Sequence, residues 1–234
     1  MAHFAENCMV CGRPLLYSET AQAKHCHLCG MQGNTNAACE AGHYVCDGCH
    51  AEKGALQITL MAGKTRSLNP IAIATELMKH PSINMHGPEH HYLVAASLLA
   101  AYQNAGGYVM LDCALQNAWQ RAKNVPGGVC GLWGSCGAGI ATGIFISIIT
   151  GATPLSIAEW SLANQMTAQS LSAISMHGGP RCCKRNSMLA IHQAAALTKA
   201  AFGIAMDLPE QVKCEFFHRN GQCREHDCLY YPTK

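Results

Sequence analysis

The sequence predicts a mainly α-helical protein, in which a helical C-terminal domain follows a small N-terminal zinc-ribbon-like or cross-brace module. Two observations carry this prediction. The chain has 15 cysteines and 13 histidines in 234 residues, concentrated in metal-ligand spacing near its start. It is also poor in charge (13%) and aromatics (6%) and rich in small and aliphatic residues, which suits closely packed helices. We place the module at 1–53, the helical domain at 67–208 and a cysteine-bearing tail at 209–234.

The first 50 residues are dense in Cys, His, Gly and Asn and show little apolar periodicity, so they cannot bury a core and must be held by metal. Cysteine and histidine at this spacing are typical of structural zinc sites, and two quartets imply two ions. The pairing can be sequential or cross-braced, and the spacing does not decide between them. The eight expected ligands are Cys8, Cys11, Cys26, Cys29, Cys39, His43, Cys46 and Cys49.

Helix signals begin after a connector at 51–66, in which we expect a short strand over 56–60. Asn69 and Pro70 start the first helix, which ends near Lys79. Further helices are expected over 88–102, 109–123, 138–150, 155–174 and 184–205, with a glycine-rich loop at 127–137. The apolar segment 140–149 is too short to span a membrane, so we expect a buried core helix there.

Four motifs in the second half carry residues suited to chemistry. At a helix start, a general base could come from His86, Glu89, His90 or His91, of which the first three are the best candidates. Glu89 also suits the helix dipole. Cys113 lies alone in a helix, and we expect it to be a buried, inert thiol. The remaining cysteines form a pair in a glycine-rich segment, a vicinal pair and a set in the tail. The tail set forms either another metal site or a lid that supplies one ligand to a central cluster. These cysteines are Cys130 and Cys136, then Cys182 and Cys183, then Cys214, Cys223 and Cys228.

Two stretches carry a family resemblance, "GSCGAGIATG" and, about 45 residues later, "GGPRCCKRNSMLAIHQAA". Over residues 128–205 the chain resembles the iron–sulfur L-serine dehydratase catalytic domain and the related cysteine desulfidases. As a whole it resembles the uncharacterised domain of unknown function family numbered 5714. The first resemblance implies a [4Fe–4S] cluster held by Cys136 and by Cys182 or Cys183. The third ligand would be Cys130, the other member of the vicinal pair or a tail cysteine.

The same resemblance implies a lyase or desulfidase-like enzyme acting on a small hydroxy or thio carboxylate or on another thiolated substrate. The alternative is a non-catalytic zinc scaffold, or a sulfur or metal relay, that meets a protein partner through the zinc module. A net charge of +2 without a basic stripe argues against nucleic-acid binding. An odd cysteine count without a signal peptide favours reduced thiols in the cytoplasm. The sequence leaves the oligomeric state open.

Overall fold

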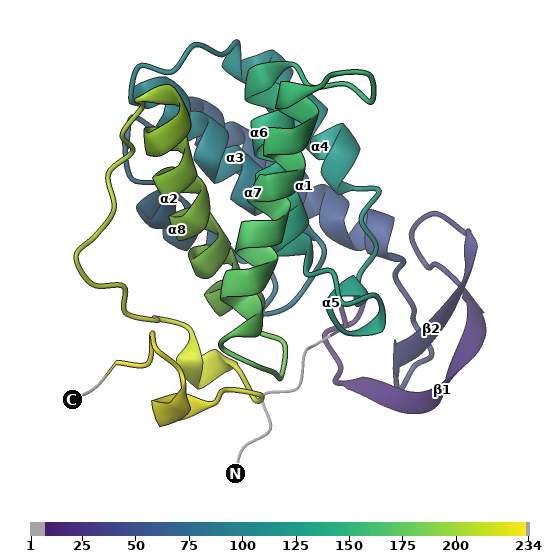
Figure 1. Cartoon of the computed structure of the whole chain (residues 1–234). Helices are drawn as coiled ribbons and strands as arrows, with labels where there is room; N and C mark the ends of the chain where they lie inside the picture. Colours follow the sequence, from purple (N-terminus) through teal and green to yellow (C-terminus); the bar gives the residue numbers. More distant parts are fainter. Residues whose placement is uncertain (1–7, 233–234) are drawn as a thin grey trace.

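The computed structural model describes residues 8–232, and within this range the chain forms eight α-helices, a two-stranded hairpin and two short 3-10 turns. The prediction of a mainly α-helical protein is therefore confirmed. The helices pack into one body, the hairpin projects to one side of it, and the tail runs beneath the ends of two helices (Figure 1). Residues 1–5, which carry the expectation of a chain without a signal peptide, lie outside the described range.

The hairpin consists of β1 (Leu15–His25) and β2 (Gln32–Cys39), which pair antiparallel. The register shifts between Tyr17 and Gln22, so the two ends of the hairpin pair in different registers. Most of its side chains are exposed, since a two-stranded ribbon has no second layer to cover it. The hairpin was not predicted, because a strand without a buried face shows no apolar alternation.

Helix α1 (Asp47–Lys64) replaces the predicted connector, and the short strand expected at 56–60 is wrong. The buried residues Ala51, Ala55, Ile58 and Ala62 recur at helical spacing and face the body. Small alanines made this stripe inconspicuous beside the exposed Leu56 and Leu60. One continuous helix therefore leads from the N-terminal module into the helical body.

Helix α3 (Glu89–Asn104) is the centre of the body and packs against α1, α2, α4, α6 and α8. Every residue from Glu89 to Tyr102 is buried, as expected for a mostly apolar helix at the centre of the body. Helix α2 (Pro70–Lys79) begins as predicted, with the Asn69 side chain accepting a hydrogen bond from the Ala72 amide at 2.9 Å.

Helices α6 (Gly137–Thr150) and α7 (Ala158–Ser175) form a close pair on one side of α3. A Cβ added at Gly139 would come too close to Leu171, and one at Gly143 would overlap the Thr167 hydroxyl. These glycines let the two backbones approach. Residues at the start and middle of α6 are buried, and no helix of the described range is long and apolar enough to cross a membrane.

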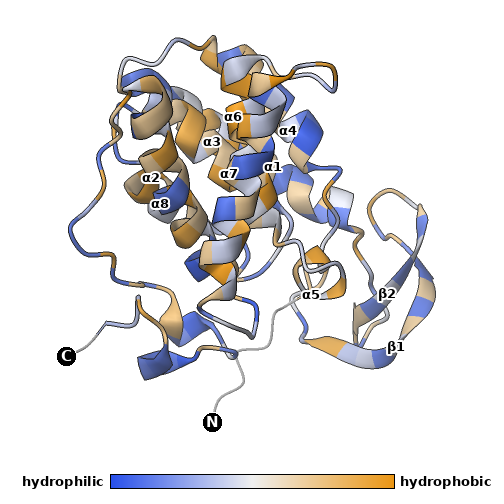
Figure 2. Cartoon of the chain, in the orientation of Figure 1, coloured by the Kyte–Doolittle hydropathy of each residue, from blue (hydrophilic) through white to orange (hydrophobic). Residues whose placement is uncertain are grey.

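The remaining elements are α4 (Leu111–Ala122), the short α5 (Val129–Leu132) inside the predicted glycine-rich loop, and α8 (Cys183–Phe202). Helix α8 ends earlier than predicted because Gly203 adopts the left-handed conformation at its C-terminus. The tail holds the 3-10 turns Phe217–Arg219 and Glu225–Asp227, and buries Phe216 and Tyr230 against the body. Hydrophilic residues are prominent in the tail turns and the hairpin, whereas apolar ones concentrate along the helices (Figure 2).

Candidate metal centres and the pocket beside them

The N-terminal module contains two groups of side chains whose ligand atoms all lie within 4.8 Å of one another, close enough to hold a metal ion. Each group takes alternate pairs along the chain. The pairing is therefore cross-braced, which decides the question that the spacing left open. One group is Cys8, Cys11, Cys39 and His43, and the other is Cys26, Cys29, Cys46 and Cys49.

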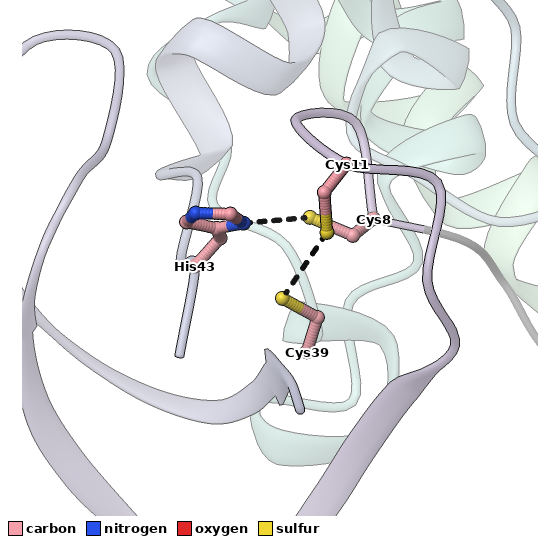
Figure 3. A group of neighbouring side chains, drawn as sticks. All are labelled: Cys8, Cys11, Cys39 and His43. Carbon is pink, nitrogen blue, oxygen red and sulfur yellow. Dashed lines mark hydrogen bonds between the residues drawn. The ribbon is translucent and has the colours of Figure 1, made fainter. Parts of the chain in front are cut away.

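In the first group, the four side chains point toward a common centre (Figure 3). The Cys8 sulfur lies 3.8 Å from His43 Nδ1, and the sulfurs of Cys11 and Cys39 are 3.7 Å apart. Gly12 adopts a φ of +72°, which a residue with a side chain would strain to reach, and so lets the Cys8–Cys11 turn close tightly. The Val10 amide then donates to the Cys8 sulfur at 3.4 Å.

The second group repeats this geometry where the hairpin meets the start of α1. The sulfurs of Cys29 and Cys46 are 3.7 Å apart, and the Cys46 amide donates to the Cys26 sulfur at 3.3 Å. Burial opposes ionisation of Cys26, but the backbone amides around its sulfur outweigh that effect and lower its pKa to about 6. Because metals bind the thiolate rather than the thiol, the amides around Cys26 favour its binding to a metal, whereas burial raises the pKa of Cys46 and of Cys49.

Between the module and the helical body lies a pocket of about 300 Å³. Its wall includes the starts of α6 and α8, the loop before α3, and two members of the first metal group, Cys8 and His43. Most of the residues predicted to act in chemistry meet here, although they come from separate segments of the chain. These are His86, His90, Cys130, Cys136, Cys182 and Cys183.

The pocket cysteines are not spaced like ligands of a single ion, since no third group within the described residues brings its ligand atoms within 4.8 Å. Two amide side chains donate to their sulfurs, Asn186 to Cys136 at 3.5 Å and Asn220 to Cys182 at 3.8 Å. Burial raises the pKa of Cys183 to about 12. Cys113, by contrast, is exposed on α4, so the expected buried thiol is wrong.

The predicted acid/base residues differ in whether their side chains line the pocket. His90 lines it, but its two ring nitrogens contact the Gly87 carbonyl at 3.0 Å and Lys184 Nζ at 2.9 Å. Burial and the positive charge of Lys184 lower the His90 pKa to about 3, so the imidazole is neutral at ordinary pH. Lys184 is itself fully buried and also donates to the Asn84 carbonyl at 2.7 Å.

Glu89 is fully buried and does not line the pocket. Its carboxylate accepts hydrogen bonds from the Asn84 backbone and side chain, at 2.9 and 3.2 Å, and lies 3.6 Å from His50 Nδ1. Burial opposes ionisation, but the contact with His50 outweighs it and lowers the Glu89 pKa to about 2. Glu89 thus ties the loop before α3 to the residue that follows the last ligand of the second metal group.

His91, from the same sequence motif as His86 and His90, is the residue of the pocket best suited to accept a proton. It lines the pocket, and its Nδ1 donates to the Val125 carbonyl at 3.1 Å, which leaves Nε2 unprotonated in the neutral ring. Burial lowers its pKa, which keeps the ring neutral. A Cβ on Gly137 would overlap the ring, so this glycine lets His91 lie against the start of α6.

The predicted tail cysteines meet at a second, smaller cavity of about 20 Å³. Cys214, Cys223 and Cys228 line it together with Cys182 of the vicinal pair. Burial, helped by the neighbouring Cys182, Cys228 and Cys223, outweighs the hydrogen bond from the Phe216 amide and raises the Cys214 pKa to about 11. Cys182 therefore lies on the walls of both cavities.

Fold and sites together define a helical protein with a cross-braced metal-binding module and a cysteine-lined pocket. The chain belongs to the family of unknown function DUF5714, whose model matches residues 58–231. The match starts within α1, so the helical body and tail carry the family signature and both metal groups precede it. No curated protein and no solved structure matches the chain.

Proposed function

We propose that this protein is an iron–sulfur-dependent lyase of a small carboxylate that carries a hydroxyl or thiol group, with two structural zinc ions in its module. One observation carries the proposal: the pocket gathers Cys130, Cys136, Cys182 and Cys183 beside an unprotonated imidazole nitrogen and a cationic side chain. Reduced thiols of this kind fit a cytoplasmic protein.

Zinc suits the module because each group offers four soft or borderline ligands at single-ion spacing. Four protein ligands fill the coordination sphere of a zinc ion and leave no position for a substrate, so both ions would be structural. The sheet of the module is a two-stranded hairpin with mostly exposed side chains, which cannot hold itself together by burial.

An iron–sulfur cluster suits the pocket because its wall is rich in thiols whose spacing is wider than that of single-ion ligands. The hydrogen bond from the Asn186 side chain to the Cys136 sulfur would tune such a centre. When bound through three thiolates, a [4Fe–4S] cluster supplies an open iron that acts as a Lewis acid on a substrate hydroxyl or thiol.

A carboxylate has two anchors on the same wall. Arg181 lines the pocket with an exposed side chain, and a guanidinium binds carboxylates through paired hydrogen bonds. Gly137 and Ala138, the first residues of α6, also line the pocket, and amides at a helix start favour negative charge. The substrate carboxylate would thus lie between the start of α6 and Arg181.

His91 is the proposed general base. Its Nε2 would take the proton from the carbon next to the carboxylate, and the released electron pair would form a carbon–carbon double bond. The hydroxyl or thiol on the neighbouring carbon would leave with its bonding electrons and, after gaining a proton, depart as water or hydrogen sulfide. The elimination is redox-neutral and needs no other reactant.

Anaerobic reconstitution with iron and sulfide tests the proposal. The wild-type chain should gain broad visible absorption, which Cys136→Ala should abolish and the exposed Cys113→Ala should keep. Release of water or sulfide from a panel of small hydroxy and thio carboxylates should be lost in His91→Gln and kept in His192→Gln, at an exposed position of α8. A colourless protein that binds zinc alone would contradict the proposal.

A second candidate function is a zinc scaffold for a protein partner. The module exposes apolar side chains that the body does not cover, namely Leu16 (56%), Leu28 (50%) and Met31 (65%). Such side chains suit a protein interface. In that case Leu16→Ser with Met31→Ser should abolish binding of a partner isolated with the wild-type chain, while cluster content and turnover stay absent in both.

A further inference from the structure

We infer that a third metal centre, outside the module and next to the pocket, holds the tail to the start of α8. Its ligands are Cys182, which also lines the pocket, and the tail residues Cys214, Cys223 and Cys228. The four cysteines line one small cavity between the tail and α8. Three of them come from the tail, and the fourth is the residue that caps α8. This inference is independent of the proposed lyase function.

Backbone amides point at these sulfurs as they do in the module. The Phe216 amide donates to the Cys214 sulfur at 3.4 Å, and the Glu225 amide to the Cys223 sulfur at 3.3 Å. Both bonds reach two residues back, like the bond from the Val10 amide to the Cys8 sulfur in the first metal group. The tail turns thus present backbone amides to sulfur in the same way as the first metal group does.

The tail backbone also carries an unusual conformation at this place. Glu225 has a φ of +48°, the only positive φ of a non-glycine residue in the described part of the chain. This conformation is costly for a residue with a side chain and is kept only where the surroundings fix it. The amide of this same residue donates to the Cys223 sulfur.

The tail has few other means of staying folded. Its helical segments are single 3-10 turns, and its described buried side chains are Phe216, Asn220 and Tyr230. A segment with so little burial and regular structure gains most from a metal staple. The cavity, about 20 Å³, has room for roughly one water molecule, so it is not a substrate site.

The centre would take a thiophilic metal, either a zinc ion or an iron–sulfur cluster. The small cavity favours a single ion, whereas sulfur spacing beyond the single-ion limit favours a cluster. Assigning Cys182 to this centre leaves Cys130, Cys136 and Cys183 for the pocket. Those three thiolates match the number that a [4Fe–4S] cluster with an open iron requires.

Metal analysis of the full chain, purified and reconstituted without oxygen, tests the inference. Relative to wild type, Cys223→Ser should lose either about one zinc ion or the iron and sulfide of one cluster, about four atoms of each. The zinc and iron contents of the variant show whether the centre holds a zinc ion or an iron–sulfur cluster. Cys113→Ser should lose neither, and Cys136→Ala should lose pocket iron alone. Unchanged metal content in Cys223→Ser would overturn the inference.

A measurement on the wild-type chain covers the case in which Cys223→Ser does not fold. Cysteine alkylation mapped by mass spectrometry should show Cys214, Cys223 and Cys228 protected in the metal-loaded chain and reactive after chelation. Protection that persists after chelation would mean that burial alone shields these thiols, and the inference would fail. Failure here leaves the proposed lyase testable, because Cys136 belongs only to the pocket.

Discussion

The N-terminal module and the helical body use cysteine in opposite ways. In the module, ligand atoms converge within 4.8 Å in a segment that buries little. In the body, a packed core built around α3 holds the fold, and cysteines from the starts of separate helices line a pocket of about 300 Å³. Cysteine supports the fold in the first region, whereas in the second the fold positions cysteine.

This difference explains which pairings can be inferred from spacing. A CxxC pair is local, so its two sulfurs meet whatever the rest of the chain does. Which pair joins which depends on the hairpin, because β2 brings Cys39 back beside the start of β1 and so places it near Cys8 and Cys11. In the body, Cys136 and Cys183 meet only through the packing of α6 against α8.

Removal of metal should produce the largest difference between the two regions. Chelation of the full chain should unfold the hairpin and leave the helices folded, because structural zinc contributes about 10–16 kcal/mol to folding in small zinc domains. NMR amide spectra should lose the dispersed signals of 15–39 while circular dichroism keeps its helical signal. Hairpin signals that survive complete removal of metal would show that the module does not depend on it.

The body should instead respond to pH through a buried cation. Burial lowers the Lys184 pKa to about 8 from an ordinary 10.5. Between these pH values the unfolded chain keeps a proton that the folded chain has lost, so the free energy of unfolding rises with pH, by on the order of 3 kcal/mol. Urea unfolding followed by circular dichroism should show this rise in wild type and in the exposed Lys199→Met, but not in Lys184→Met. An equal rise in all three chains would exclude Lys184 as its source.

Close packing in the body gives a smaller and local effect. In Gly143→Ala, the new Cβ would overlap the Thr167 hydroxyl and lie 3.0 Å from the Ala163 carbonyl, so we expect a loss of about 1–3 kcal/mol in the free energy of unfolding. Gly63→Ala is the matched control, because nothing lies within 4 Å of its new Cβ. It should gain about 0.5–1 kcal/mol from helix propensity. Equal effects at both sites would contradict the close contact of α6 with α7.

The sequence predicts those features that depend on neighbours along the chain. It gives the start of α2 from Asn69 and Pro70, the later helices to within a few residues, and the metal-ligand pairs. It misses α1 because alanines form its buried stripe, and it misses the hairpin because neither face is covered. The sequence also could not show that Glu89 links the module to the body, because its contact with His50 depends on how the module packs on the helices.

A single hydrogen bond between the module and the body gives the smallest expected effect on stability. The Gly127 amide donates to the Asp47 carboxylate at 2.9 Å, joining the first turn of α1 to the loop before α5. Asp47 is exposed, so Asp47→Ala should cost only about 0.5–1.5 kcal/mol in global stability. Hydrogen exchange at the Gly127 amide should nevertheless accelerate markedly, because that amide loses its acceptor. Glu52→Ala, at an exposed position of the same helix, should leave this exchange rate unchanged. If both variants exchange alike, the module and the body are joined by Glu89 and the pocket wall rather than by this contact.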